Sequence, residues 1–402
     1  MLGNTFGRVF QVTTCGESYG WHAKAEESGY GGALFTIVNG VPAGIRLDVP
    51  KIQDELDKRR PGRSKIDSPR KETDRVEVVS GLFEGVTTGA PVGLLIRNVD
   101  TQDIHIHQYR QVKDVIRPGH AELNFFYKYG ESADWCGAGR ASGRETVGRV
   151  AGGAVAKQIL AREGIEVLAH IIESRGIKGR SVSDGTMTFE EMKSNYRKND
   201  LNCCDLAAAE KMVADLMEVR EAGDTAGGAI EIVARGVPGG LGEPVFDKLK
   251  ATIAHGLCSI GAMTGLEFGA GFQSAGMLGS EWNDQPFLDR GKVRFHTNHC
   301  GGFLGGMSNG EDLLMRMGVK PTPTISKDQD TVDMMTVKEK KLSAITRRDI
   351  SILPRIYPVA EAMTAIAICD ALFLARGWYG VARLDPKWTD LAEARNKGDY
   401  TE

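Results

Sequence analysis

The stretch PVAEAMTAIAICDALFLA, residues 358–375, decides the fold. Its side chains are apolar almost all the way round a helix, which is typical of a helix buried on every side. The longest apolar run within it, residues 362–369, lies between Glu361 and Asp370. That run is far shorter than the ~18 consecutive apolar residues of a membrane span. We therefore predict a central core helix and no membrane partner.

Four more helices and six strands are predicted around this helix. Apolar spacing, with Pro50 at one start and Gly164 after one end, predicts helices at 50–60, 144–163, 206–219 and 246–257. Apolar and β-branched runs predict strands at 33–38, 75–79, 93–97, 166–172, 229–234 and 315–319. Strands and helices do not alternate regularly, so we expect an α+β fold rather than a doubly wound parallel sheet. Because no long linker rich in Pro, Ser or Gly interrupts the chain, we expect one domain over residues 1–402.

Composition excludes several classes of protein. The chain has 50 Lys and Arg against 53 Asp and Glu, a net charge of −3, whereas a dedicated nucleic-acid binder carries a basic excess. Its seven cysteines include no CxxC pair and do not suggest a disulfide framework. The first residues, MLGNTFGRVFQVTT, lack the charged-then-apolar order of a signal peptide. We expect a cytoplasmic protein with no nucleic-acid partner.

Two segments have the composition of anion sites. Residues 136–146, CGAGRASGRET, precede a predicted helix, whose first N–H groups can bind phosphate. The segment fits a phosphate cradle or an ordinary turn, and without a preceding strand Gly137-x-Gly139 is a poor dinucleotide fingerprint. The second segment has six cations within residues 59–71: Arg59, Arg60, Arg63, Lys65, Arg70 and Lys71. Pro61-Gly62 and Ser68-Pro69 shape it as a loop, which favours an anion pocket over a solvated basic face.

Three shorter motifs carry residues suited to catalysis. His120 follows the turn Arg117-Pro-Gly and suits a general acid near pH 7, although a structural role also fits. Lys320-Pro-Thr-Pro-Thr324 combines a cation with hydroxyls, and Arg347-Arg348-Asp349 flanks a carboxylate with cations that should keep it ionised. Surface salt bridging is the alternative for both. His105-x-His107 would place both rings on one strand face, but no third ligand nearby supports a metal site.

These segments together resemble the chorismate synthase family. The matching blocks follow family order from Gly3 to Glu361. They are Gly16-Glu-Ser18, Arg60-Pro-Gly62, Arg70-Lys-Glu72, Arg117-Pro-Gly-His120, Gly139-Arg140, Arg144-Glu-Thr146, Gly242-Glu-Pro-Val-Phe-Asp-Lys-Leu249, Gly301-Gly302, Gly305-Gly306, Ser308-Asn-Gly310, Lys320-Pro-Thr-Pro323 and Arg347-x-Asp349.

The resemblance implies a fold, a reaction and an assembly. The fold would be a single β-α-β sandwich with long helices between antiparallel sheets, assembled as a homotetramer. The reaction would be the anti-1,4-elimination of phosphate from 5-enolpyruvylshikimate 3-phosphate, giving chorismate in the shikimate pathway to the aromatic amino acids. It requires reduced FMN without net redox change. The sequence leaves open whether the chain reduces FMN itself with NADPH or depends on an external flavin reductase.

The resemblance also implies roles for individual residues. His120 would protonate the departing phosphate or hold the flavin in its active form, Asp349 would assist N5 of the flavin in taking the C6 proton, and Ser18 would lie against the substrate. The residues implied to bind the substrate's phosphate and carboxylates are Arg59, Lys65, Arg117 and Arg144. The residues implied to surround FMN are Arg140, Ala141, Ser142, Gly261, Ala262, Gly305, Lys320, Pro321, Thr322, Pro323, Thr324 and Arg347.

The first motif departs from the family. The family pattern is Gly-Glu-Ser-His-Gly, whereas this chain has Tyr19 in the histidine position, followed by an insertion of about eleven residues, 21–31. A phenol with pKa ~10 is a poorer proton shuttle near pH 7 than an imidazole at ~6.5. In an active enzyme Tyr19, His22 or water would supply the missing proton. The alternatives are a paralogue that eliminates phosphate from a related ester and a non-catalytic flavin-binding oligomer.

Overall fold

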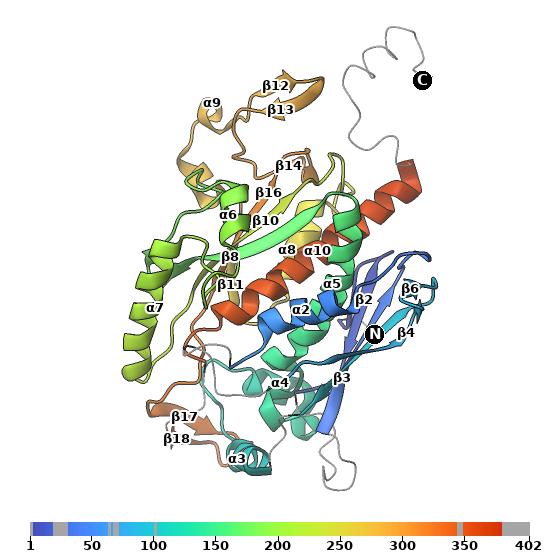
Figure 1. Cartoon of the computed structure of the whole chain (residues 1–402). Helices are drawn as coiled ribbons and strands as arrows, with labels where there is room; N and C mark the ends of the chain where they lie inside the picture. Colours follow the sequence, from blue (N-terminus) through green and yellow to red (C-terminus); the bar gives the residue numbers. More distant parts are fainter. Residues whose placement is uncertain are drawn as a thin grey trace.

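Two five-stranded sheets enclose a layer of long helices (Figure 1). The computed structural model describes residues 3–18, 31–62, 66, 72–99, 103–343 and 349–379. The first sheet has the strand order β1-β2-β3-β7-β4 and the second β11-β16-β10-β8-β9. Every pair of neighbouring strands in both sheets is antiparallel. The architecture confirms the predicted α+β sandwich.

The strands of both sheets turn one face toward the helices. In β3 the side chains of Leu34, Thr36 and Val38 are buried, in alternation with partly exposed neighbours. The first sheet comprises β1 Thr5–Phe6, β2 Gln11–Cys15, β3 Gly31–Asn39, β4 Val76–Ser80 and β7 Val92–Asn98. The second comprises β8 Glu166–Ser174, β9 Ile177–Lys178, β10 Gly228–Arg235, β11 Met263–Phe268 and β16 Leu313–Val319.

Four helices fill the space between the sheets: α2 Val49–Arg59, α5 Thr146–Arg162, α8 Leu249–Cys258 and α10 Leu353–Tyr379. The segment Leu353–Gly377 of α10 is long and apolar enough to cross a membrane, but 89% of its most apolar window is buried inside the protein. It is therefore a core helix, as predicted. At the contact with α5, a Cβ on Gly153 would lie 2.3 Å from the Cβ of Ala362, so only glycine allows this approach.

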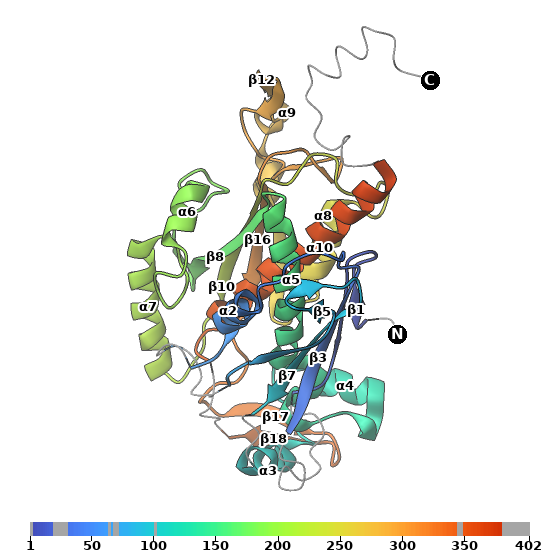
Figure 2. The same ribbon diagram turned by 45° about the vertical axis from the view of Figure 1, so that its right-hand side comes forward.

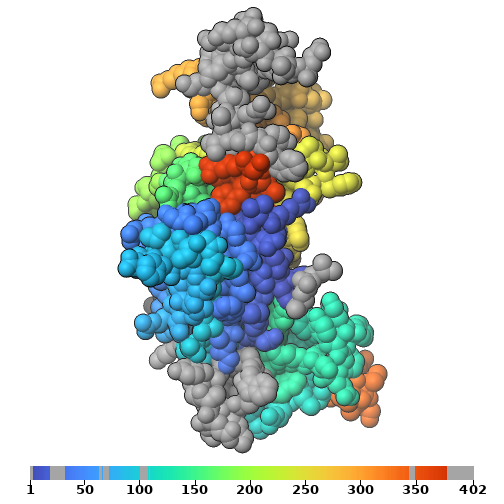
Figure 3. Space-filling model, turned by 90° about the vertical axis from the view of Figure 1, so that its right-hand side faces the viewer, coloured from blue at the N-terminus to red at the C-terminus, as the bar shows by residue number. Residues whose placement is uncertain are grey.

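The remaining helices lie outside the sandwich. Figure 2 shows α6 Phe189–Asn195 and α7 Leu206–Glu221 on the outer side of the second sheet. Helices α3 Asp103–Val112 and α4 Glu122–Tyr129 lie at the end of the molecule opposite the short helix α9 Gly279–Trp282 (Figure 1). Figure 3 shows the first sheet, blue to cyan, at the molecular surface. Val79 of β4, in that sheet, is exposed.

Four hairpins extend from this body. They are β5 Leu82–Phe83 with β6 Val86–Thr87, β12 Pro286–Asp289 with β13 Lys292–Phe295, β14 Phe303–Leu304 with β15 Met307–Ser308, and β17 Gln329–Asp333 with β18 Lys338–Leu342. The glycine-rich stretch 301–310 is thus a tight hairpin. The hairpin β17–β18 packs beside residues 115–116, where Ile116 N–H donates to the Val332 carbonyl at 3.1 Å.

Two carboxylates of α10 hold distant segments of the chain. Asp370 is buried and accepts hydrogen bonds from the backbone N–H groups of Arg8, Val9 and Phe10 at 2.7–3.0 Å. Glu361 is fully buried and accepts from Lys157 Nζ, the Tyr196 hydroxyl and the Ala169 N–H, each at 2.7 Å. We call Glu55, Lys58, Lys157, Tyr196 and Glu361 the lysine cluster.

The predicted helices and strands are confirmed, with four corrections. The central helix predicted over 358–375 extends from Leu353 to Tyr379, with Pro358 inside it. The helix predicted from 246 begins at Leu249, because Glu243 and Asp247 close a turn before it. The helix predicted from 144 begins at Thr146, after a single 3₁₀ turn. The strand expected at His105-x-His107 is wrong, because both residues belong to α3, where positions two apart do not share a face.

Candidate functional site

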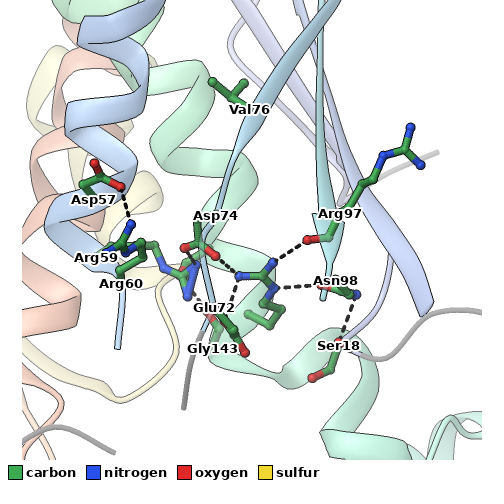
Figure 4. A network of polar contacts seen from close by, with 12 residues as sticks. Ser18, Asp57, Arg59, Arg60, Glu72, Asp74, Val76, Arg97, Asn98 and Gly143 are labelled. Atoms are coloured by element: carbon green, nitrogen blue, oxygen red, sulfur yellow. Dashed lines mark hydrogen bonds and ion pairs between the residues drawn. The ribbon is translucent and has the colours of Figure 1, made fainter. Parts of the chain in front are cut away.

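Arg144 joins the end of the first sheet to the loops beside it. It lies in the 3₁₀ turn Gly143–Glu145 and is almost fully buried. Its guanidinium donates to Asn98 Oδ1 and Glu72 Oε2, both at 2.8 Å, to the carboxylate of Asp74, and to the Arg97 carbonyl at 3.3 Å. Figure 4 shows these partners converging from separate segments of the chain.

Arg59 is held by the same aspartate. It ends α2, is 1% exposed, and donates through NH1 to Asp74 Oδ2 at 2.9 Å. Burial disfavours its charged form and lowers the pKa of Arg59 to about 10, although the charge of Asp74 opposes that shift. Burial alone would raise the pKa of Asp74, but the charges of Arg59 and Arg144 outweigh it and hold that pKa below its usual value.

Asp349 connects to this group through Arg355. Arg355, in the first turn of α10, donates to Asp349 Oδ2 at 2.8 Å, and its charge acts on both Arg59 and Asp74. We call Arg59, Glu72, Asp74, Arg144, Asp349 and Arg355 the arginine cluster. Within the described residues, NH2 of Arg59 and Nε of Arg355 are buried without a hydrogen-bond partner. Buried donors of this kind are costly unless a ligand satisfies them.

Ser18 lies beside the cluster. Its Oγ accepts from Ser142 Oγ at 3.1 Å, and its carbonyl accepts from Asn98 Nδ2 at 3.1 Å. Asn98 therefore connects Ser18 to Arg144. The structure thus brings together Ser18, Ser142, Arg59, Arg144 and Asp349, all selected from sequence motifs.

The glycine-rich segment before α5 is a left-handed turn. Gly137, Ala138 and Gly139 all have positive φ, between 48° and 67°. Such angles favour glycine and explain two of the motif's glycines. Ser142 Oγ then accepts the Arg144 N–H at 3.2 Å at the start of the 3₁₀ turn. The geometry establishes the turn, and the phosphate cradle stays a prediction.

His120 lies against the Lys320–Thr324 segment. Its Nε2 is 3.0 Å from Thr324 Oγ1, and Lys320 Nζ donates to the neighbouring Gly119 carbonyl at 2.8 Å. A Cβ on Gly119 would lie 2.7 Å from Pro323, so the glycine permits this close approach. Burial, followed by the charges of Arg117 and Lys320, lowers the pKa of His120 to about 3. The imidazole is therefore neutral in this structure.

Two further flavin candidates join the same segment. The Ala262 carbonyl accepts the Lys320 N–H at 2.9 Å, which places Gly261 and Ala262 beside it. Ala262 has a φ of 71°, an uncommon value for a residue other than glycine. The turn at 260–262 and the strand end at 319–320 therefore form one wall.

Arg117 has a partner that sequence reasoning missed. Its Nε donates to Glu122 Oε1 at 2.7 Å, and its charge lies over the Tyr109 ring at 5.7 Å. Glu122 and Ala141 border a cavity of about 430 Å³, and its apolar walls include Phe125, Phe126, Trp135, Met334 and Met335. The spacing Arg117-x₄-Glu122, at the start of a helix, was the available signal.

Some predicted residues do not join this group. Gly305 lies in the β14–β15 turn, near the Leu313 end of β16, whereas Lys320 follows the other end. Seven extended residues separate these ends by roughly 20 Å, so one chain does not place Gly305 beside Lys320. Arg140 is exposed and bonds to Asn4. Tyr19, Lys65, Arg347 and residues 21–30 of the insertion lie outside the described residues.

Across the described ranges, no group of three or more His, Cys, Asp or Glu side chains could hold a metal ion. The three aspartates and glutamates of the arginine cluster instead face arginines.

Comparisons with known proteins agree with this geometry. The family model described as chorismate synthase matches residues 10–373. A chorismate synthase of Acetivibrio thermocellus is 53% identical over 399 residues, 97% of this chain and 100% of that protein. One of Methanocella arvoryzae is 46% identical, over 92% of this chain and 95% of that protein. A crystal structure of chorismate synthase superposes with a TM-score of 0.70 at 27% identity, covering 98% of both chains.

Proposed function

The chain belongs to the chorismate synthase family of phosphate-eliminating lyases, and we propose that the arginine cluster and the His120 turn together form the site of its reaction. The family match and 53% identity over nearly the whole chain establish the overall activity as that of a chorismate synthase in the shikimate pathway. The substrate is therefore 5-enolpyruvylshikimate 3-phosphate and the products are chorismate and phosphate. The placement of that chemistry in this chain is our proposal.

The observation that carries the proposal is the set of open guanidinium donors in the arginine cluster. The substrate bears a phosphate and two carboxylates, and planar guanidinium groups bind such anions through paired hydrogen bonds. Arg59 and Arg355 each have a buried N–H without a partner among the described residues, whereas Arg144 is fixed by several acceptors. We propose that Arg59 uses its open N–H for these anions, and that Arg117, Arg144 and Lys65, which the family resemblance implies, bind them too.

Reduced FMN, which this family uses, fits the wall beside His120. Among the described residues, the Thr322 hydroxyl is buried there without a hydrogen-bond partner, which leaves a group for a ligand. Residues 140–142, 261–262 and 320–324, together with Arg347, would hold the cofactor. When bound, the reduced flavin supplies an electron-rich ring and an N5 atom that can accept the C6 proton, with no net redox change.

The chain's own residues then manage the protons and charges. Thr324 fixes the imidazole of His120. Burial lowers the pKa of His120 most, followed by the charges of Arg117 and Lys320, and the phosphate of a bound substrate would oppose those charges. His120 can then gain a proton and donate it to the departing phosphate. Arg355 holds the carboxylate of Asp349 in place, and that carboxylate would assist the flavin N5 in taking the proton. Ser18, fixed by Asn98 and Ser142, borders the substrate. Tyr19, His22 or water supplies the proton that the family histidine provides.

The first experiment is anaerobic turnover of 5-enolpyruvylshikimate 3-phosphate with dithionite-reduced FMN, following phosphate and chorismate together. We expect both products at rates of about 1–10³ s⁻¹. Turnover of another phosphate ester in place of this one would favour the paralogue. Flavin binding with no product from any ester would favour the non-catalytic oligomer.

Asp349→Ala tests the site itself. Loss of a positioned proton-transfer group typically costs about 10²–10⁴-fold in rate, so we expect kcat to fall by that amount while FMN titration gives an unchanged affinity. A kcat near that of the wild type would remove Asp349 from the mechanism.

We also propose a cytoplasmic homotetramer, as the family resemblance implies. Light scattering during gel filtration measures the assembly. Replacing dithionite by NADPH under the same anaerobic conditions separates a self-reducing enzyme from one that needs an external flavin reductase.

A further inference from the structure

We propose that Asp74 is a positioning residue for this reaction, because its carboxylate fixes Arg59 and Arg144 relative to each other. The proposal rests on the proposed function, in which these two arginines bind the substrate's anions. Asp74 itself is fully buried and therefore acts through the arginines rather than by touching substrate.

Each carboxylate oxygen of Asp74 serves one arginine. Oδ2 accepts from Arg59 NH1 at 2.9 Å and Oδ1 accepts from Arg144 NH1 (Figure 4). The two guanidiniums come from the end of α2 and from the turn before α5, 85 residues apart along the chain by their numbers. The carboxylate therefore makes one unit of two cations that the fold delivers separately.

The backbone holds this carboxylate rigidly. Asp74 has a φ of 46°, in the left-handed region that residues other than glycine rarely adopt. Gln53 of α2 secures the segment on both sides: its Nε2 donates to the Asp74 carbonyl at 3.2 Å and its Oε1 accepts the Val76 N–H at 3.0 Å. The backbone around Asp74 is thus bonded to α2, the helix that carries Arg59.

Charge gives the second reason for Asp74. Arg59, Arg144 and Arg355 are mutually repulsive, and the charges of Arg355 and Arg144 lower the pKa of Arg59. Asp74 opposes this repulsion, and its own lowered pKa keeps it ionised at neutral pH. Without the carboxylate, the two arginines would move apart or shift toward other acceptors. Arg144 would keep Asn98 and the Arg97 carbonyl as anchors, so the main displacement should fall on Arg59.

The test compares Asp74→Asn with Glu77→Gln. Glu77 is three residues further on, and also pairs with an arginine, Arg97, at 2.8 Å, but it is 43% exposed. For Asp74→Asn we expect KM for 5-enolpyruvylshikimate 3-phosphate to rise at least about tenfold, the equivalent of 1.4 kcal/mol, with unchanged FMN affinity. Glu77→Gln should leave KM and kcat unchanged. A merely structural role would instead lower the active fraction, and hence apparent kcat, without moving KM.

Asp74→Glu covers the case in which the asparagine variant does not fold. It keeps the charge but displaces the carboxylate by one methylene, so a positioning role again predicts a raised KM. A KM equal to that of the wild type in either folded variant overturns the proposal.

A double-mutant cycle separates this proposal from the proposed function. Arg59→Met alone should raise KM; an unchanged KM would show that Arg59 does not bind substrate and that the proposed site is wrong there. If Asp74 works through Arg59, the double variant Arg59→Met with Asp74→Asn should lose little more than Arg59→Met alone. If Arg59→Met raises KM and the double variant raises it by the full product of the two single effects, the positioning role of Asp74 is overturned and the proposed function is left intact.

Discussion

Neighbouring residues at the end of α2 enter two buried ionic clusters that differ in one respect. Lys58 belongs to the lysine cluster and Arg59 to the arginine cluster. In the lysine cluster, Lys157 uses three hydrogen bonds, two to Glu55 and one to Glu361, and Lys58 donates to Glu55 at 2.7 Å. Each side-chain nitrogen and oxygen of the lysine cluster has at least one hydrogen-bond partner, whereas in the described chain the arginine cluster has two buried nitrogens, NH2 of Arg59 and Nε of Arg355, with none.

The difference supports a structural role for the lysine cluster and the proposed ligand-binding role for the arginine cluster. A buried ion pair is tolerated when its hydrogen bonds are complete, and the lysine cluster meets that condition between α2, α5, α10 and β8. Burial would raise the pKa of Glu55, but Lys157 and Lys58 lower it to about 2, so the cluster stays charged. In the proposed function, a bound anion would complete the hydrogen bonds of the arginine cluster.

The largest expected effect comes from breaking the lysine cluster. Glu361→Gln removes the carboxylate that Lys157 and Lys58 face, and breaking a buried pair typically costs about 3–5 kcal/mol. We expect urea denaturation to show a loss of that size. The KM of the remaining folded enzyme should stay that of the wild type, and a changed KM would show that the two clusters are coupled.

An intermediate effect should follow from a substitution in the arginine cluster. Arg144→Lys keeps the charge but loses the fork that reaches Asn98, Glu72 and Asp74 together. We expect kcat/KM to fall by about 10²-fold, which corresponds to about 2.7 kcal/mol, with a smaller loss of stability than in Glu361→Gln. Steady-state kinetics alongside thermal melting measures both. Equal losses in the two assays would indicate that Arg144 is as structural as Glu361.

The smallest effect concerns pH. Folded His120 has a pKa of about 3, whereas an unfolded histidine titrates near 6.5, so only the unfolded chain takes up this proton between those values. The contribution of His120 to stability is complete above pH 6.5 and declines as pH falls toward 3, by at most about 1.4 kcal/mol per pH unit. His120→Asn should lose less stability than wild type between pH 6.5 and 5.5 in urea titrations. Parallel curves would contradict the lowered pKa.

Local apolar patterns predicted the helices and strands well because the buried side chains recur with the period of the helix or strand. The all-round apolar stretch at 358–375 became the core of α10, and the strand predicted at 315–319 lies inside β16. Strand β2 was missed because Gln11, Thr13 and Thr14 give it no apolar run. The histidine pair in α3 was misassigned because Ile104-His105-Ile106-His107 alternates as a strand would, but over only four residues, and so short a run also occurs inside a helix.

The sequence predicted the arginines of the candidate site but not the residues that bond to them. Motifs identified Arg59, Arg117 and Arg144, yet the roles of Asp74, Asn98 and Glu122 emerged only in three dimensions. Arg144 lies 70 residues from Asp74 and 46 from Asn98, so no local spacing connects them. Gly305 shows that a motif residue need not join the site: it lies near one end of β16, whereas Lys320 follows the other end.

The bonds between Asp370 and residues 8–10 also constrain how the chain is made. They join positions about 360 residues apart, and the first sheet packs on helices that include α10. A ribosome would therefore release almost the whole chain before the backbone at Phe10 finds its acceptor. Folding of the first sheet to its final state must wait for α10, and contacts of such long range slow folding. A chaperone-depletion experiment would find the vulnerable interval after synthesis rather than during it.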